Sequence, residues 1–295
     1  MTQIRNAPIR NAPIRNAMTV DVEDYFQVQA FAHCIDRKDW DDFPRRVDAN
    51  TNRILDQFAT HGVKATFFTL GWVAERFPAL IRRIVADGHE LASHGWDHTR
   101  VDSQEPEAFR ADISRTKALL EDTGGTPIAG YRAATFSIGA RNLWAFPILR
   151  QEGYLYSSSI NPIRHDLYGM PDAPRVPFHP DPTGVLEIPM TTVRLLGRNW
   201  PCSGGGYFRL LPTMLYRSGL KRVNRHDRQP GIFYFHPWEI DAAQPRIPNA
   251  GWKSRLRHYT NLSRMQGDLD DLLRDFAWDR MDRVYAPALA EAVAA

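Results

Sequence analysis

The stretch MTVDVED, residues 18–24, predicts a short strand that ends in three acids. In α/β folds, catalytic groups and ligands cluster at the carboxyl ends of the strands. Asp21, Glu23 and Asp24 are therefore candidate site residues. A strand end is also commonly exposed, so a solvated cluster of charge is the alternative interpretation of these acids.

Beyond this stretch, strand-like and helix-like segments alternate along the chain. Continuous apolar runs favour strands, and apolar residues at helical spacing favour helices. Strands are expected at 63–70, 90–93, 128–131, 154–157, 185–188 and 231–235, and helices at 47–59, 72–86 with a break before Pro78, 105–121, 142–151 and 254–276. The alternation predicts βαβ units in a parallel sheet or barrel.

The N-terminal segment repeats one pentapeptide, IRNAP, up to residue 17. Proline at every fifth position blocks a helix, and five residues fit no solenoid repeat. We therefore expect residues 1–17 to be a flexible tail. No linker interrupts the rest of the chain, so residues 18–290 are expected to form one domain.

The composition restricts the class of protein. With 43% hydrophobic residues in 295 the chain can bury a large core. Its formal charge of +3 comes from interleaved acids and bases, which favours neither nucleic acid nor an anionic membrane surface as a partner. Cys34 and Cys202 form no CxxC pair, which favours a reducing compartment. There is no apolar run of about 18 residues for a membrane span, and no secretory h-region. We expect a cytoplasmic protein without a transmembrane segment, whose oligomeric state is left open.

A second candidate motif, SHGWDH at 93–98, follows the strand expected at 90–93. On a helical turn His94 and His98 would share one face. With one carboxylate they could hold a metal ion and leave positions open for water and substrate. The HxxxH spacing is common by chance, so two surface histidines are the alternative.

Two more motifs follow strands. Arg132, in YRAATF, could form a bidentate pair with a carboxylate, or could be a surface arginine. His236, in IFYFHPW, is placed to act as a general acid, or could be a satisfied core histidine. Four such motifs after four strands, in this order, are far more specific than any one of them.

Together these motifs resemble the carbohydrate esterase family 4 polysaccharide deacetylases, which share the NodB homology domain. The resemblance runs from about Met18 past His236, and is most specific to the branch associated with exosortase and exopolysaccharide loci. Its matching stretches are TVDVEDYFQV, SHGWDH, IRHDLYG, SGGGYFRLLP, FHPWEID and RHYTNL. The resemblance implies a distorted (β/α) barrel and a metal-dependent hydrolase that removes N-acetyl groups from an amino-sugar polysaccharide or its precursor.

The resemblance also implies a metal site, usually for zinc, on His94, His98 and one carboxylate of the first motif. The family pattern has two adjacent acids, the first a base and the second a ligand. This chain offers three. We favour Asp21 as the base and Asp24 as the ligand, with Glu23 a rival for either role.

The remaining motifs are assigned by the same resemblance. Arg132 would orient the base, and His236 would protonate the departing sugar amine. A backbone N–H near Tyr131 would stabilise the oxyanion. Aromatic and polar side chains that suit sugar rings are expected to bind substrate, namely Tyr131, Phe136, His165, Asp166, Tyr168, Tyr207 and Trp238. Packing is the alternative for each of them, and ranks slightly ahead for Trp238.

The glycine run 204–206 would let a ligand approach the backbone closely, and turn formation is its alternative. Two departures from the family pattern stand out. Ala134 replaces a proline, and Ser157 occupies the position of an Asp that tunes the acid histidine. Either another acid substitutes, or His236 titrates differently, or activity is reduced.

Two other functions stay open. The departures are compatible with a catalytically weak carbohydrate-binding relative. Some relatives of the fold are metal-independent amidohydrolases that act on small ureides. The retained metal histidines argue against both.

Overall fold

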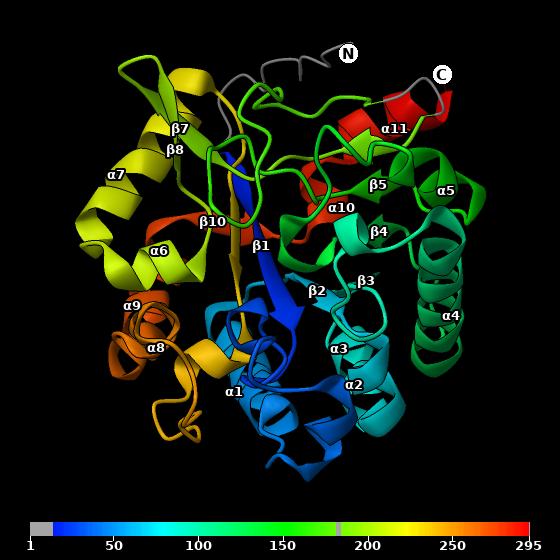
Figure 1. The fold of residues 1–295 in the computed structure, drawn as a ribbon. Helices are drawn as coiled ribbons and strands as arrows, with labels where there is room; N and C mark the ends of the chain where they lie inside the picture. The colour runs from blue at the N-terminus through cyan, green and yellow to red at the C-terminus, as the bar shows by residue number, and fades with distance from the viewer. Residues whose placement is uncertain (1–13, 181–183, 295) are drawn as a thin grey trace.

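The computed structural model describes residues 14–180 and 184–294. Its core is a mainly parallel sheet with helices packed around it (Figure 1). The strands are β1 (Arg15–Val22), β2 (Thr66–Thr69), β3 (Glu90–Ser93), β4 (Gly130–Tyr131), β5 (Tyr156–Ser157), β6 (Leu186–Glu187), β7 (Thr192–Leu195), β8 (Arg198–Pro201), β9 (Ile232–Phe235) and β10 (Ala277–Asp279).

The helices surround this sheet and continue to the C-terminal end of the chain. They are α1 (Val47–His61), α2 (Gly71–Arg76), α3 (Pro78–Ala86), α4 (Pro106–Gly124), α5 (Ala145–Gln151), α6 (Gly205–Leu210), α7 (Thr213–Arg222), α8 (Trp252–Tyr259), α9 (Leu262–Asp275), α10 (Met281–Val284) and α11 (Ala286–Ala294). The break expected before Pro78 is confirmed, because α2 ends at Arg76 and α3 begins at the proline. No helix of the described residues is long and apolar enough to cross a membrane.

The strand order of the main sheet is β10-β1-β2-β3-β4-β5-β6, and β9 also pairs with β1. All of these pairings are parallel. Within the described residues no ladder joins β6 to β9, so the sheet forms an open half-barrel. The expected distorted (β/α) barrel is confirmed. A parallel arrangement brings the carboxyl ends of β1, β3, β4 and β9 to one end of the barrel.

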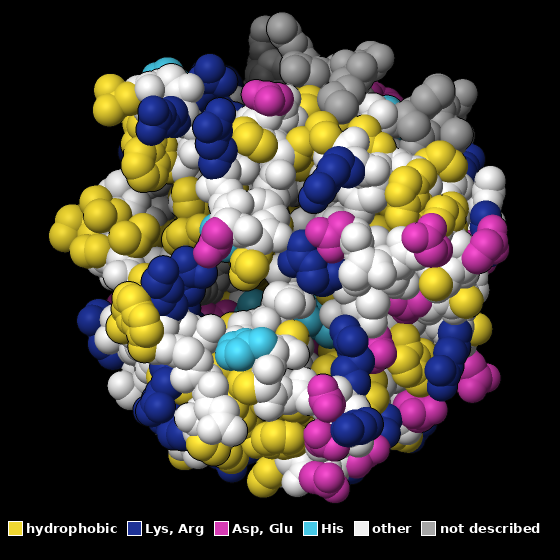
Figure 2. Space-filling view, in the orientation of Figure 1, with side chains coloured by type: hydrophobic (Ala, Val, Ile, Leu, Met, Phe, Trp, Pro, Cys, Tyr) yellow, Lys and Arg dark blue, Asp and Glu magenta, His cyan; other side chains and the backbone are white. Residues whose placement is uncertain are grey.

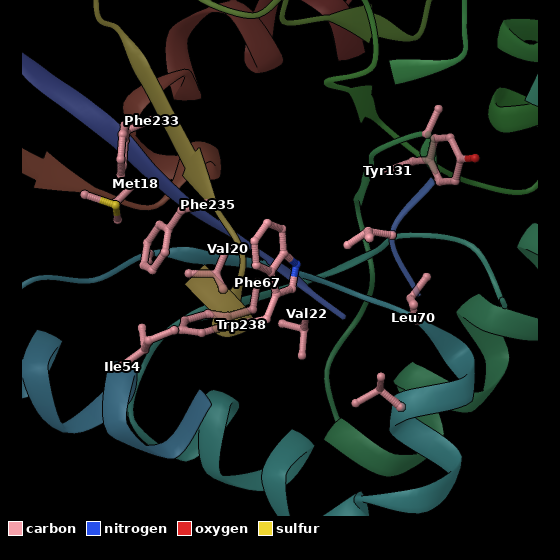
Figure 3. Close-up of a cluster of buried hydrophobic side chains, with 14 of the residues drawn as sticks. Met18, Val20, Val22, Ile54, Phe67, Leu70, Tyr131, Phe233, Phe235 and Trp238 are labelled. Atoms are coloured by element: carbon pink, nitrogen blue, oxygen red, sulfur yellow. The ribbon is translucent and has the colours of Figure 1, made fainter. Parts of the chain in front are cut away.

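Strand β1 supplies both the core and the site, because successive side chains of a strand point to opposite faces. Met18, Val20 and Val22 are fully buried in the main hydrophobic cluster. Figure 3 shows this cluster, with Met18 and Val20 beside Phe233 and Phe235 of β9 and near Ile54 of α1. The alternate residues, Thr19 and Asp21, face the other way, toward Arg132.

The expected tail is wrong at its C-terminal boundary. Residues 1–13 lie outside the described part of the chain, but residues 15–17 belong to β1 and pair with β10. Asn16 is fully buried, and its Oδ1 accepts hydrogen bonds from the Gly231 N–H at 2.8 Å and from the Asn224 side chain at 2.7 Å. The pentapeptide repeat concealed this strand because its last copy merges with the apolar run after it.

Deleting residues 2–17 is therefore expected to destabilise the protein relative to deleting residues 2–13. The longer deletion removes the partner of Gly231 and Asn224 and the ladder to β10, and each buried polar group left unpaired costs about 1–3 kcal/mol. We expect a melting temperature roughly 5–10 °C lower for the longer deletion. Equal melting temperatures of the two truncated proteins would show that this end of β1 is dispensable.

The long helix expected at 254–276 is divided into α8 and α9. Thr260 and Asn261 separate the two helices, and Asn261 adopts a left-handed conformation with φ of 56°. The carbonyl groups at this break are hydrogen-bonded, because the guanidinium of Arg209 donates to those of Arg257, His258 and Thr260. Leu256, expected on the packed face, is 57% exposed.

Candidate active site

The four sequence motifs meet at the carboxyl ends of the parallel strands. Asp21 lies in β1 and Glu23 just after it, His94 follows β3, Arg132 follows β4 and His236 follows β9. All of them except His236 are at least nine-tenths buried, whereas the His236 side chain is 20% exposed. The site is therefore a buried cluster of charge that opens to solvent at His236.

A candidate metal centre is formed by Glu23, His94 and His98, whose ligand atoms all lie within 4.8 Å of one another. The two histidines do not sit on a helical turn, as the spacing suggested. They belong to a loop after β3 in which Gly95 and His98 have positive φ values of 76° and 58°. These left-handed residues fold the loop back, and the two imidazole centroids are 5.3 Å apart.

The donor set fits a divalent cation. Nδ1 of His94 lies 2.8 Å from the Arg132 carbonyl oxygen, which can only accept, so Nδ1 carries the proton and Nε2 keeps a lone pair. Oε2 of Glu23 is buried and has no hydrogen-bond partner among the described residues, although His98 Nε2 lies 3.0 Å away. Burial lowers the pKa of both histidines, which favours the neutral form that binds metal.

Asp24, which we favoured as the metal ligand, is placed elsewhere. Its Oδ2 accepts backbone N–H bonds from Arg46 at 2.7 Å and Val47 at 2.9 Å, at the start of α1, and its Oδ1 accepts from Tyr25 N–H at 2.9 Å. A carboxylate at a helix N-terminus is stabilised by these otherwise unpaired donors. Glu23 therefore takes the position in the cluster that we gave to Asp24, because β1 turns after Val22 and directs the two side chains apart.

Asp21 is held by a buried arginine. Arg132 is fully buried, and its Nη1 donates to Asp21 Oδ1 at 2.6 Å and to the Thr19 hydroxyl at 2.8 Å. Its Nε donates to the Ser158 carbonyl oxygen at 3.2 Å. The guanidinium also lies over the ring of Phe68, 4.0 Å from the centroid. A fixed cation beside the carboxylate holds it in one orientation, as expected of a positioned proton acceptor.

His236 has a carboxylate partner that the sequence motifs did not reveal. Its Nδ1 lies 2.8 Å from Oε1 of Glu239, which also accepts the His236 backbone N–H at 3.1 Å. Oε2 of Glu239 accepts from Arg209 Nε at 2.7 Å, and both of these side chains are about 1% exposed. Imidazole, carboxylate and guanidinium thus form a chain in which each group fixes the next.

The charges in this chain shift two pKa values strongly. Burial lowers the pKa of His236, but the carboxylates of Glu23, Glu239 and Asp21 outweigh it and raise the pKa to about 9. Burial raises the pKa of Glu239, but Arg209 and His236 more than offset it and lower the pKa to about 2. These carboxylates, Glu239 among them, favour the protonated imidazole of His236, the form that has a proton to donate.

Two glycines of the run, Gly204 and Gly205, serve packing inside the protein, whereas a Cβ on Gly206 would meet nothing within 4 Å. A Cβ on Gly205 would lie 2.5 Å from Glu239 Oε1, and one on Gly204 would lie 2.6 Å from the Tyr234 hydroxyl. The absence of side chains there makes room for Glu239 and Tyr234. The sequence carried a usable signal for Glu239, since it lies three residues after His236 on a tight turn, but it carried none for Arg209, which lies 30 residues before Glu239.

Glu239→Gln should lower the turnover number of any hydrolysis at this site by roughly 10- to 100-fold, the usual cost of losing an orienting group. The amide keeps the size of the carboxylate but cannot hold the imidazolium or balance Arg209. We expect little change in KM, because Glu239 lies behind His236. A turnover number equal to that of the wild type, with an unchanged melting temperature, would exclude this role.

Ser157, at the family position of the tuning Asp, does not replace that acid. Its hydroxyl donates to the Ser159 hydroxyl at 2.8 Å, and in the sheet it is paired with Glu187 of β6. Since Glu239 already contacts His236, the structure favours the first of the three alternatives, namely that another acid substitutes. We therefore do not expect Ser157→Asp to strengthen His236.

Ser157→Asp should instead destabilise the protein, most strongly at high pH. Burial raises the pKa of Glu187 from 4.5 to about 7. A folded state that holds this proton more tightly than the unfolded state loses stability as pH rises between these values. A second carboxylate beside Glu187 would enlarge that loss and move it to higher pH. Between pH 4.5 and about 7 the melting temperature should fall more steeply with pH in Ser157→Asp than in the uncharged control Ser157→Asn. Equal falls in the two variants would contradict an interaction between residue 157 and Glu187.

The predicted substrate residues divide into two groups. Phe136, His165 and Tyr168 line a hollow of about 330 Å³, in which the rings of His165 and Tyr168 stack at 4.0 Å. Tyr207 is half-buried beside Tyr168, so the rings of His165, Tyr168 and Tyr207 are accessible for sugar contact. Phe136 is 6% exposed and packs beneath them. Asp166 also borders this hollow and pairs with Arg257 at 3.3 Å.

The other two predicted substrate residues are core residues. Trp238 is 7% exposed, stacks on the His236 and His258 rings, and its Nε1 lies 3.4 Å from Glu23 Oε1. It supports the site and offers no sugar platform. The Tyr131 side chain is 2% exposed and packs against Phe109 and Tyr154. The contribution of the backbone near Tyr131 to an oxyanion hole stays a prediction.

Comparison with known proteins finds similarity to polysaccharide deacetylases. The polysaccharide deacetylase family matches residues 39–154, and a domain of unknown function, DUF3473, matches residues 158–286. A peptidoglycan-N-acetylglucosamine deacetylase of Bacillus cereus is 37% identical over 75 residues, which are 25% of this chain and 27% of that protein. A chitooligosaccharide deacetylase of Rhizobium leguminosarum bv. trifolii is 41% identical over 70 residues, 24% of this chain and 33% of that protein.

The similarity to these curated relatives is confined to a third or less of their length. Over the whole chain, a provisionally assigned polysaccharide deacetylase from Mycobacterium smegmatis superposes with a TM-score of 0.62 at 16% identity, covering 98% of this chain and 96% of that one. At that identity the superposition shows the fold alone. Residues 39–154 of this chain therefore form a region of the polysaccharide deacetylase type. The main sheet combines strands from both matched regions.

Proposed function

We propose that the protein is a metal-dependent hydrolase that removes N-acetyl groups from an N-acetylglucosamine-containing polysaccharide. The observation that carries the proposal is the grouping of Glu23, His94 and His98 next to His236, whose Nε2 lies 3.4 Å from Glu23 Oε1 and 4.0 Å from Asp21 Oδ2. Arg132 holds Asp21, and Glu239 holds His236. The names of the relatives in Bacillus and Rhizobium support the choice of an amino-sugar polymer.

The residues divide the reaction into two proton transfers. Glu23, His94 and His98 would hold the cation, which we propose to be zinc because two imidazoles and one carboxylate with open positions suit it. When bound, the cation polarises the amide carbonyl and lowers the pKa of water. Asp21 accepts a proton from the attacking water, and Arg132 keeps the carboxylate in place. Hydrolysis of an amide needs both a cation and a proton acceptor, because neutral water is a weak nucleophile and an amide carbonyl is a weak electrophile.

The second transfer releases the product. His236, protonated near neutral pH and partly exposed, donates its proton to the nitrogen of the departing sugar amine. Glu239 orients the imidazole and stabilises its charge, and Arg209 fixes Glu239. The C–N bond breaks, and the products are acetate and a free amino sugar.

Two finer assignments accompany this proposal. The matches to the exosortase-associated branch support a role in exopolysaccharide biosynthesis, with the polymer or its precursor as substrate. A cytoplasmic location is supported by Cys34 and Cys202, which are both free.

Acetate release from N-acetylglucosamine oligomers, measured together with the metal content of the purified protein, tests the proposal. We expect release by the metal-loaded protein, its loss after chelation, and its return with zinc. Tight binding of the oligomers without acetate release from any N-acetylated glycan would favour the carbohydrate-binding alternative. Full activity of the metal-free protein would favour a metal-independent amidohydrolase.

A further inference from the structure

The exposed apolar side chains of this protein are concentrated in one region. Nine of the ten large hydrophobic residues that are exposed in the described part of the chain belong to the β7–β8 hairpin, the α6–α7 segment or α8. They are Leu195, Leu196, Trp200, Leu210, Leu211, Met214, Leu215, Trp252 and Leu256. We call this set the apolar patch. A patch of this kind normally marks an interaction surface.

The apolar patch follows one side of the molecule. In Figure 1 the β7–β8 hairpin, α7, α6 and α8 succeed one another down the left edge. Helix α7 packs against β7, and α6 packs against both α7 and α8. Figure 2 shows hydrophobic side chains along the same edge, separated by lysine and arginine side chains. The elements thus present their apolar groups on a common side.

The charge of this region differs from that of the rest of the chain. Between Thr192 and Arg228 the sequence has eight Lys and Arg residues and one acid, Asp227, giving +7 in a chain whose total is +3. Asp227 is already paired with Arg175 at 2.7 Å. Six of the eight cations are exposed, namely Arg194, Arg198, Lys221, Arg222, Arg225 and Arg228. No carboxylate within residues 14–180 and 184–294 pairs with any of these six.

The shape of the patch favours a lipid surface over a protein. Leu196, at the tip of the hairpin, is 99% exposed, and Met214 at the start of α7 is 73% exposed. These side chains project outward and are interleaved with cations, whereas the core of a protein interface is depleted in charge. At a membrane, projecting apolar groups enter the acyl region while long cationic side chains stay with the headgroups. Trp200 and Trp252, both exposed, are of the type enriched at that boundary.

We propose that the apolar patch and its six exposed cations dock the protein on an anionic phospholipid surface. The hairpin tip and the first turn of α7 enter the lipid, and the cations bind the headgroup phosphates. The proposal does not depend on the hydrolytic function, and it requires no membrane-spanning segment.

Sedimentation of the full chain with lipid vesicles tests the proposal. We expect binding to mixed phosphatidylglycerol–phosphatidylcholine vesicles, weaker binding to pure phosphatidylcholine, and loss of the difference at high salt. Lys221→Glu/Arg222→Glu should weaken binding to the anionic vesicles at least about tenfold, because each cation near such a surface contributes strongly. Arg82→Glu/Arg150→Glu changes the net charge equally on α3 and α5, away from the patch, and should bind like the wild type.

The apolar contribution has its own pair of variants. Leu196→Asn should weaken vesicle binding roughly tenfold, and asparagine suits the positive φ of 51° at this position. Leu167→Asn, at the one exposed large hydrophobic residue outside the patch in the described part of the chain, is the control and should change nothing. All variants should keep the melting temperature of the wild type.

Three results would overturn the proposal. The first is absence of vesicle binding by the wild type. The second is equal weakening by the patch variants and their controls. The third is a dimer in light scattering that Leu196→Asn dissociates without any vesicle binding, since the patch would then be an interface between two copies.

Discussion

Glu23→Gln protein is expected to bind little or no divalent metal and to release acetate at least about 1,000-fold more slowly than the wild type. The physical reason is that Glu23 supplies the anionic group of the cluster with His94 and His98. An amide binds cations far more weakly than a carboxylate, and loss of the cation removes several kcal/mol of transition-state stabilisation. Metal content by elemental analysis and acetate release are the two measurements.

The matched control is the adjacent acid. Asp24→Asn should keep both the metal and the activity, because Asp24 caps the start of α1 and lies outside the cluster. Its cost should appear as a lower melting temperature, from the weakened bonds to the Arg46 and Val47 N–H groups. If Asp24→Asn empties the metal site and Glu23→Gln leaves it full, the assignment from the structure is wrong and the family pattern of adjacent acids holds.

Asp21→Asn is expected to retain the metal but to lose about 100- to 10,000-fold in turnover, the range typical of a missing general base. Asparagine can still accept the hydrogen bond from Arg132 Nη1, so the local geometry survives, but it cannot take a proton from water. The measurements are metal content, the turnover number and KM.

Loss of metal in Asp21→Asn, with retention in Glu23→Gln, would exchange the two roles. Activity close to that of the wild type would mean that Glu23 or a water chain accepts the proton. A large rise in KM with an unchanged turnover number would assign Asp21 to substrate binding.

The residues near β1 show what a single sequence can and cannot specify. The strand, the acids and their position at the barrel end were evident from MTVDVED, because the apolar alternation and the buried strands fix them. The sequence did not show whether Glu23 or Asp24 is the metal ligand. That choice depends on how the chain turns after Val22 and on the backbone N–H groups of Arg46 and Val47, which bind Asp24. Those donors are more than twenty residues away along the chain and carry no side-chain signature.

The segment after Ser157 was less predictable than the segment before it. The apolar pattern located β9 at Ile232–Phe235. It predicted α8 and α9 as one helix, because the pattern of apolar residues cannot reveal a break at which backbone carbonyl groups bind Arg209. The β7–β8 hairpin and α7 were not predicted either. Many of their apolar residues are exposed, so the sequence there lacks the periodic pattern of a buried face. Local sequence patterns indicate which residues are buried. These elements instead depend on polar contacts between residues far apart in the sequence, or carry apolar residues that are exposed.

The contact between His236 and Glu239 keeps the proton donor oriented even when distant parts of the sheet fluctuate. The two residues are three positions apart on one tight turn, so little loop-closure entropy is lost when they meet, whereas an acid on β5 would have to be held by a separately positioned strand. Local fluctuations that open the short β5–β6 edge of the sheet, where each strand has two residues, would leave the donor pair intact. Hydrogen exchange at Ser157 and Glu187 can therefore be fast without loss of the donor geometry.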